Sequence, residues 1–530
     1  MSSTDRRTFI LGGVAGAATL LAGTYGLRES SIVPGEILGS SSRVGHMLRD
    51  RKDWPQPSRE TEIPVAIVGA GVSGLSAAWF LNRSGVNDFL VFDLEDEAGG
   101  NARAGGNHVS RYPWGAHYLP VPNEESHWVR TFLEETGVIT GRDRTGRPVY
   151  DEFALCAEPA ERLHIHGRWQ NGLIPSFGVA GSDRTQMDAF FARIEKYRFA
   201  RGRDGKPAFA IPIRESSRDS EFLALDQITM AEFLRRNGWT TPYLNWYVDY
   251  CCRDDYGTSF QETSAWAGIH YFAGRRGWSA NTDHDTVLTW PEGNAWLVDR
   301  MKSGFKDRIR TSTAALRVSQ DSDGAVLDMF HVPTGTVERV RARTVIWAGP
   351  RFVAERVIEG LPRAPEFSYA PWMVANITLT DVPNGAADSW DNVFYGSKSL
   401  GYVVATHQNV TPYPKETVLT YYWPLSHAAP LEARREALAR PHAEWSALVL
   451  KDLRRTGIEP FVNRLDVWLW GHGMIRPTPG FIWGTERSER HGTVFFAHSD
   501  MSGISIFEEA QDQGIRAARQ AARLLGARIA

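Results

Sequence analysis

Residues 63–103 constrain this chain more than any other stretch, because they combine an apolar strand, a glycine-rich turn, a helix and a second strand in one unit. Residues 65–68 predict a buried strand, and Gly69, Gly71 and Gly74 follow it with GxGxxG spacing. The first glycine permits a tight turn, the second lets the backbone approach a pyrophosphate, and the third lets the helix pack closely on the strand. The unit is typical of dinucleotide-binding proteins.

The elements that flank this turn support the same interpretation. Ser73 lies in the first turn of the predicted helix, where free N–H groups and the positive end of the helix dipole would face phosphates. Gly85 ends the helix, and residues 89–92 predict a second strand. Asp93 follows that strand at the right distance for a carboxylate that accepts hydrogen bonds from a ribose diol.

The segment after Asp93 carries a resemblance to a known family. Residues 96–103, with sequence DEAGGNAR, resemble the acidic stretch and paired glycines of the FAD-dependent amine oxidase and phytoene desaturase superfamily. The resemblance implies FAD as cofactor, with its diphosphate near Gly99, Gly100, Asn101 and Arg103. The chain departs from the usual pattern at Asp93, where Glu is commoner, and at Asn101, where amine oxidases mostly carry Arg. The departure at Asn101 slightly favours the desaturases over the amine oxidases.

Later segments extend the resemblance. Residues 112–120 resemble the segment that the superfamily runs along the flavin, which places Gly115 and Ala116 by the ring and Tyr118 toward the substrate. Residues 290–298 resemble the segment that returns to the FAD domain. Residues 344–350 resemble a strand near the cofactor, and residues 497–500 stand where the family carries Ala-Gly-Glu or Ala-Gly-Asp. The further implied cofactor contacts are Ala315, Ser499 and Asp500.

The catalytic group is left open by the sequence. Weak candidates are the titratable and aromatic side chains in two pocket-like runs, namely His117, Tyr118, Trp470 and His472. Each is equally compatible with a structural role. Residues 253–256 form a charged cluster that we interpret as a structural ion pair at a helix end.

The expected fold is α/β, with a glutathione-reductase-type Rossmann FAD-binding domain assembled from discontinuous segments and an inserted α+β substrate domain. We assign residues 63–120, 285–360 and 465–530 to the FAD domain, and residues 121–284 and 361–464 to the substrate domain. Residues 28–62 are expected to be a linker. Residues 505–508 read as a capping box at the start of the last helix.

Composition excludes several classes of function. The 530 residues include 42% hydrophobic and 23% charged residues, and the net charge of −3 gives no basis for nucleic-acid binding. The three cysteines do not form a disulfide framework, and the adjacent Cys251 and Cys252 are expected to be buried and inert. No spacing of His or Cys predicts a metal site.

The N-terminus resembles a twin-arginine export signal. Arg6 and Arg7 precede an apolar segment that continues to about residue 22, and we assign residues 1–27 to the signal. The twin-arginine machinery, which exports folded proteins, is therefore an expected partner, and the expected location is the periplasm or another exported site. A membrane contact is expected only if the signal stays uncleaved.

Three functions are compatible with these observations. The first is amine oxidase-like hydride transfer from a small organic substrate to flavin, with oxygen or a periplasmic acceptor reoxidising it. The second is a phytoene desaturase-like dehydrogenase or isomerase of an apolar substrate. The third is a flavin-fold binding protein without turnover. A nicotinamide is not the expected reductant, because the sequence has no second strand-GxGxxG-helix unit.

Overall fold

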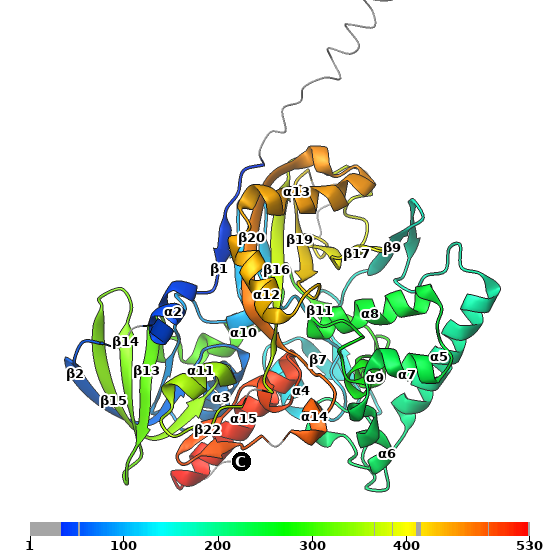
Figure 1. Cartoon of the computed structure of the whole chain (residues 1–530). Helices are drawn as coiled ribbons and strands as arrows, with labels where there is room; N and C mark the ends of the chain where they lie inside the picture. Colours follow the sequence, from blue (N-terminus) through cyan, green and yellow to red (C-terminus); the bar gives the residue numbers. More distant parts are fainter. Residues whose placement is uncertain are drawn as a thin grey trace, which may run out of the picture.

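The computed structural model describes residues 33–50, 53–364, 366–383, 385–409, 415–485 and 487–527. Two large sheets, each covered by helices, dominate these residues (Figure 1). The predicted export signal lies outside the described residues, so it stays a prediction. Among the residues described, no helix combines the length and the hydropathy that a membrane crossing requires.

The first sheet is the predicted dinucleotide-binding sheet. Its central strand β2 pairs in parallel with β3 on one side and with β15 on the other, and Val65 and Ile67 of β2 are fully buried. β15 also pairs in parallel with β22 and continues into an antiparallel meander. The strands are β12 (Ile309–Arg310), β3 (Phe89–Phe92), β2 (Arg59–Val68), β15 (Thr336–Trp347), β14 (Ala325–His331), β13 (Thr313–Gln320), β22 (Val494–Phe496) and β21 (Arg490–His491).

Helices cover this sheet on both faces. On one face α3 (Val72–Arg83) packs against α15 (Phe507–Leu524), and a Cβ added at Gly514 would lie 2.1 Å from the Ser73 carbonyl oxygen. Only glycine permits this approach of the two helices. α10 (Ala295–Met301) packs beside α3, and α4 (His127–Glu135) packs beside α15. The opposite face carries α11 (Arg351–Val357).

The second sheet forms the substrate side of the molecule. Its strands in spatial order are β1 (Ile37–Gly39), β20 (Val462–Ile475), β16 (Tyr369–Leu379), β19 (Thr417–Pro424), β18 (Gly401–Val404), β17 (Asp391–Phe394), β9 (Glu161–Ile165) and β10 (Arg168–Asn171). Successive side chains of β16 alternate between the two faces, so Trp372 and Val374 join one core and Met373 and Ala375 join the other. Both faces are therefore buried.

Two groups of helices cover the second sheet. One face packs against α12 (Pro430–Ala439) and α13 (His442–Leu453), a pair of helices that Pro441 separates. The other face meets a helical layer that shares its aromatic core. This layer contains α5 (Gly181–Phe199), α6 (Ser220–Leu223), α7 (Met230–Arg236), α8 (Pro242–Tyr256) and α9 (Ala265–Ala273).

Small elements join the two halves around the site. β6 (Tyr118–Pro120) pairs with β11 (Val287–Thr289), so the chain enters and leaves the helical layer at one place. The remaining elements are α2 (Ser42–Asp50), β4 (Ala104–Gly106), β5 (Arg111–Pro113), β7 (Ile139–Arg142), β8 (Pro148–Tyr150) and α14 (Phe481–Gly484).

The structure differs from the predicted organisation at three places. β20 belongs to the second sheet, although residues 465–475 were expected in the FAD domain. α4 packs on the core of the first sheet through Val129, Phe132 and Leu133, although residues 121–284 were expected in the substrate domain. The expected linker at residues 28–62 contains β1 and α2. In each case a long-range contact decides the placement, and local sequence pattern does not record such contacts.

Candidate cofactor and substrate site

The glycine-rich turn has the geometry that a pyrophosphate requires. Gly69 has a φ of 107°, and a Cβ at Gly74 would lie 1.8 Å from the Gly69 carbonyl oxygen. Gly71 is the N-cap of α3 and has no side chain to cap it, so the first N–H groups of the helix are open to a ligand. Gly100 lies so close to Gly71 that a Cβ added to it would be 3.0 Å from the Gly71 Cα. Gly99 bridges to Gly71.

Asp93 stands at the end of β3, as predicted. Its Oδ2 accepts a hydrogen bond from the Ala70 N–H (2.5 Å), and its Oδ1 accepts one from the Glu95 N–H (2.8 Å). Burial raises the pKa of Asp93 to about 6. The carboxylate therefore links the turn to the Asp93–Glu95 loop at one end of the site.

A cavity runs along this turn and joins most of the predicted cofactor contacts. It extends from Leu48 and Leu94 at the Asp93 end to Phe507 at the other. Of the predicted residues it is lined by Gly69, Gly71, Ser73, Asp93, Gly100, Asn101, Ala116, Ala315 and Ser499.

Three predicted cofactor residues have other surroundings. Gly74 packs against the Gly69 carbonyl oxygen, and the Gly99 N–H donates to the Ala70 carbonyl oxygen (2.8 Å). Arg103 pairs with Asp96 Oδ1 (2.8 Å) and lies over the ring of Trp468, 5.1 Å from its centroid. It therefore joins the Rossmann segment to the second sheet.

Asp500 also lies off the cofactor cavity. It is 1% exposed, and its Oδ2 accepts hydrogen bonds from the Tyr369 hydroxyl (2.5 Å) and the Arg351 N–H (3.1 Å). These contacts make Asp500 a structural residue between the two sheets. Ser499 occupies the cavity wall in its place.

A second cavity adjoins the first. Ala116 is exposed and lines both cavities, as does Asn294, whose Oδ1 has no hydrogen-bond partner within the described chain. The full set that lines both is Asn101, Ala116, Asn294, Ser505, Ile506 and Phe507. The cofactor cavity thus opens directly into a chamber between the two halves of the molecule.

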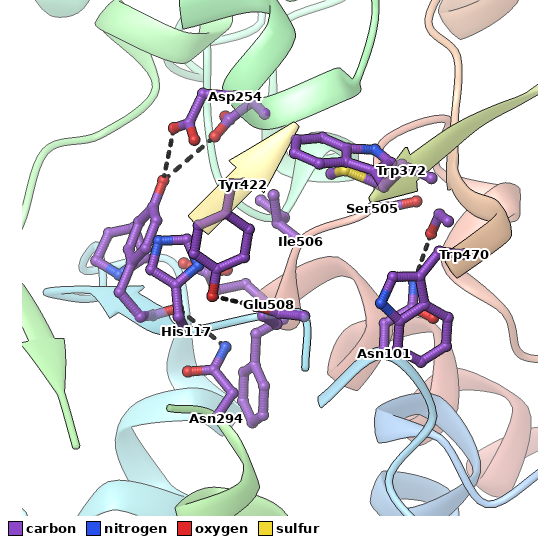
Figure 2. A pocket seen from close by; sticks show the side chains of 18 of the residues that line it. Asn101, His117, Asp254, Asn294, Trp372, Tyr422, Trp470, Ser505, Ile506 and Glu508 are labelled. Carbon is purple, nitrogen blue, oxygen red and sulfur yellow. Dashed lines mark hydrogen bonds between the residues drawn. The ribbon is translucent and has the colours of Figure 1, made fainter. Parts of the chain in front are cut away.

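Aromatic side chains form the walls of this second cavity. Figure 2 shows His117 and Tyr422 on one side and Trp372 and Trp470 on the other. His117 stacks on Tyr422 with 4.3 Å between ring centroids, and burial lowers the pKa of His117 to about 4. The imidazole is therefore neutral at pH 7. Gly115, which was expected by the flavin ring, lines this cavity and accepts a hydrogen bond from the Tyr422 hydroxyl (3.0 Å).

Trp470 and His472 alternate along β20 and differ in role. Trp470 lines the cavity, and its Nε1 donates to the Trp114 carbonyl oxygen (2.6 Å). His472 lies off the cavity, where it stacks on Phe352 at 4.2 Å. His472 is therefore a packing residue, and the candidate role does not hold for it.

A buried charged network occupies one end of the second cavity. Arg275 donates to Asp255 Oδ1 (2.5 Å) and to the Tyr118 hydroxyl oxygen (3.2 Å), and that hydroxyl donates to Asp254 Oδ2 (3.3 Å). Burial and the neighbouring Asp255 raise the pKa of Asp254 to about 7. Two residues of the cluster predicted at 253–256 form ion pairs: Arg253 pairs with Asp249 (2.9 Å) and Asp255 pairs with Arg275 (2.5 Å).

Glu508 is the third carboxyl group of this cavity and was not among the site residues predicted from the sequence. It is 3% exposed and lies in the first turn of α15. Its Oε2 has no hydrogen-bond partner among the described residues, and burial raises its pKa to about 7. The predicted capping box is wrong, because α15 begins at Phe507 and Ser505 instead accepts a hydrogen bond from the Ile475 N–H (3.0 Å).

Cysteines and metal ligands take no visible part in the site. Cys251 and Cys252 are buried, free and side by side on α8, and burial raises the pKa of both thiols well above its usual value. Such thiols are unreactive. Among the described residues, no group of three or more His, Cys, Asp or Glu side chains is placed to hold a metal ion.

Comparisons with known proteins agree with the fold. Residues 67–136 match the model of the NAD(P)-binding Rossmann-like domain. A ketocytochalasin monooxygenase of Aspergillus clavatus is 38% identical over 106 residues, which cover 19% of this chain and 15% of that protein. The chain therefore spans about a sixth of the length of this curated relative.

Solved structures match over most of the chain. A putrescine oxidase double mutant matches with a TM-score of 0.63 and 15% identity, over 88% of this chain and 100% of that one. Cyclohexylamine oxidase from Brevibacterium oxydans matches with a TM-score of 0.61 and 16% identity, over 88% and 100%. A fatty acid isomerase from P. acnes matches with a TM-score of 0.59 and 14% identity, over 86% and 98%.

These matches confirm the predicted fold class. The chain has the α/β fold of the flavin-dependent amine oxidases, with a Rossmann-type dinucleotide domain and a second domain over it.

Proposed function

We propose that the protein is an FAD-dependent oxidoreductase that oxidises an organic amine at the carbon next to nitrogen. The proposal rests on one observation, the excess of buried carboxyl groups in the cavity next to the cofactor cavity. Among the described residues that line it, Asp254, Asp255 and Glu508 face a single arginine, Arg275. The two histidines there, His117 and His270, have pKa values lowered to about 4 by burial.

The residues present fit FAD. The open N-terminus of α3, the close approach of Gly100 to Gly71 and the carboxylate of Asp93 suit a diphosphate and a ribose. Ala116 and the unpaired Asn294 Oδ1 leave a surface at the junction of the two cavities that a flavin ring would cover. When bound, FAD supplies the hydride acceptor.

The charged groups of the cavity suit a cation. A buried carboxylate without a partner is costly, so an ammonium group that donates to Glu508 Oε2 would stabilise the complex. Oxidation at carbon requires the neutral amine, and the Glu508 carboxylate is placed to accept the ammonium proton. Asp255 is already paired with Arg275, which leaves Asp254 and Glu508 as the groups that add negative charge.

The aromatic walls orient the rest of the substrate. The His117–Tyr422 stack and Trp470 present flat apolar surfaces beside the junction with the cofactor cavity. An apolar group on the amine would be held between them and shielded from water. Oxygen or a periplasmic acceptor would then reoxidise the reduced enzyme, and export by the twin-arginine route stays part of the proposal.

A second candidate function is dehydrogenation or isomerisation of an apolar substrate. It is favoured by the apolar side chains that line the cavity, among them Trp372, Val374, Met474, Ile506 and Phe507. The similarity in fold to a fatty acid isomerase is compatible with it. The acid excess favours the amine, because an apolar chain leaves the carboxyl group of Glu508 without a partner.

Anaerobic mixing separates these functions. Purified protein is mixed with a panel of amines, amino acids, fatty acids and polyenes, and with NADH and NADPH, while flavin absorbance near 450 nm is recorded, about where oxidised flavins absorb. We expect an amine to bleach the flavin and both nicotinamides to leave it oxidised. Bleaching by an apolar substrate alone would favour the second function. Rapid bleaching by a nicotinamide would refute both.

A further inference from the structure

The chain before the Rossmann unit reaches from the second sheet to the cofactor cavity. We name residues 34–50, which contain β1 and α2, the N-terminal clasp. Its first part is anchored on β20: Ile37, Leu38 and Gly39 are in parallel register with residues 467–469. A Cβ at Gly35 would lie 1.7 Å from the Leu465 carbonyl oxygen, so this contact admits only glycine. The anchor is therefore specific.

The middle of the clasp is hydrogen-bonded to the loop that carries the ribose acid. The N–H and the hydroxyl of Ser41 donate to the two carboxylate oxygens of Glu95, at 2.9 and 3.0 Å. The backbone N–H of Glu95 in turn donates to Asp93 Oδ1. The position of the clasp is thus coupled to the residue that is expected to hold the ribose.

The last part of the clasp closes one end of the cofactor cavity. Val44 of α2 is 5% exposed and packs with Ala314 and Phe330 of the meander. Leu48, one turn further along α2, lines the cavity together with Leu94, Glu95 and Ala315. Asp93, the residue expected to hold the ribose, lines the same part of the cavity and marks this as the end where the adenosine of FAD would lie. Leu48 is therefore the side chain by which α2 reaches the adenosine end.

We propose that the N-terminal clasp is part of the cofactor site: it closes over the adenosine of bound FAD and sets the rate at which FAD leaves. The inference rests on the proposed binding of FAD. A ligand held at this end leaves only when α2 moves, because Leu48 and the Ser41–Glu95 bonds stand across its exit. The clasp acts on retention of the cofactor and contributes no group to the substrate cavity.

The test measures how fast FAD dissociates. FAD-loaded full-length protein is freed of unbound flavin by rapid desalting and diluted into buffer, and the rise of free flavin fluorescence is followed over time. For Leu48→Asp we expect dissociation to be about tenfold faster, since an apolar contact is replaced by a charge. For Ser41→Ala we expect about a threefold increase, since one of the two hydrogen bonds to Glu95 is lost.

The matched control is His46→Asp, which places the same charge on an exposed position of the same helix. We expect its dissociation rate to equal that of the wild type. Thermal unfolding of each apoprotein checks that the substitution has not disturbed the fold. Ser41→Ala tests the inference even if Leu48→Asp does not fold. An FAD dissociation rate that is unchanged in both variants would overturn the proposed role of the N-terminal clasp. Wild-type protein that never carries FAD would instead refute the proposed function.

Discussion

Gly71→Val is expected to give a folded protein that no longer retains FAD. Gly71 has an extended backbone with a φ of −75°, which any residue can adopt. A Cβ there would meet only the Gly100 Cα, at 3.8 Å, so the protein itself has room for it. The valine methyl groups would instead occupy the space that the pyrophosphate needs. We expect FAD affinity to fall about a hundredfold or more.

The neighbouring glycine supplies the contrast. A Cβ at Gly74 would lie 1.8 Å from the Gly69 carbonyl oxygen, so Gly74→Val should disrupt the packing of α3 on β2 and prevent folding. Circular dichroism and the FAD content of the purified variants distinguish the two effects. A Gly71→Val protein that keeps a full complement of FAD would show that the cofactor does not approach this turn.

Glu508→Gln is expected to weaken amine binding by about ten- to a hundredfold. The substitution keeps the shape of the side chain but removes the charge that would pair with the ammonium group, a loss of about 1.5–3 kcal/mol. Anaerobic flavin bleaching as a function of amine concentration gives the apparent dissociation constant and the limiting rate separately.

The matched control is Glu509→Gln on the same turn of α15. Glu509 is also fully buried, but its carboxylate accepts a hydrogen bond from the Ile213 N–H (2.6 Å) and does not line the cavity. The amide oxygen of glutamine preserves this bond, so we expect amine affinity close to that of the wild type. Equal effects of the two substitutions would remove Glu508 from the binding site.

The pH dependence gives a second readout of Glu508. Burial raises the pKa of Glu508, and burial with Asp255 raises that of Asp254, both to about 7. Both groups are protonated and neutral below this pH and ionised above it, so kcat/KM for an amine should rise with pH through about 7. Two groups titrate in the wild type, and only Asp254 does in Glu508→Gln. On the acid side of the pH profile, kcat/KM should therefore fall less steeply in Glu508→Gln than in the wild type.

The Rossmann unit could be predicted from sequence because its signals are local. The strand at residues 65–68, the glycines of the turn and Asp93 follow one another within one stretch, and Gly69 has a positive φ of 107° that few other residues adopt. The register of the C-terminal contact could not be predicted. Ser499 and Asp500 are adjacent, and only the long-range bonds of Asp500 to Tyr369 and Arg351 show which one faces away from the cavity.

The substrate cavity was beyond reach for the same reason. Asp254 and Asp255 on α8 and Glu508 on α15 are about 250 residues apart in sequence, and only the folding of the whole chain brings them to one chamber. Glu508 did carry a signal, since an acid after two apolar residues at a helix start is compatible with a buried position. The same signal fits a capping box, and the contact of Ser505 with Ile475 decides against that.

The most direct test of the cofactor assignment is to precipitate purified full-length protein with acid and to analyse the supernatant. We predict one FAD per chain in solution, since Cys156, Cys251 and Cys252 are buried with raised pKa values and the cavity holds its ligand by packing and hydrogen bonds. Chromatography and the flavin spectrum identify the nucleotide. A supernatant with a nicotinamide dinucleotide, or with no flavin at all, would contradict the account.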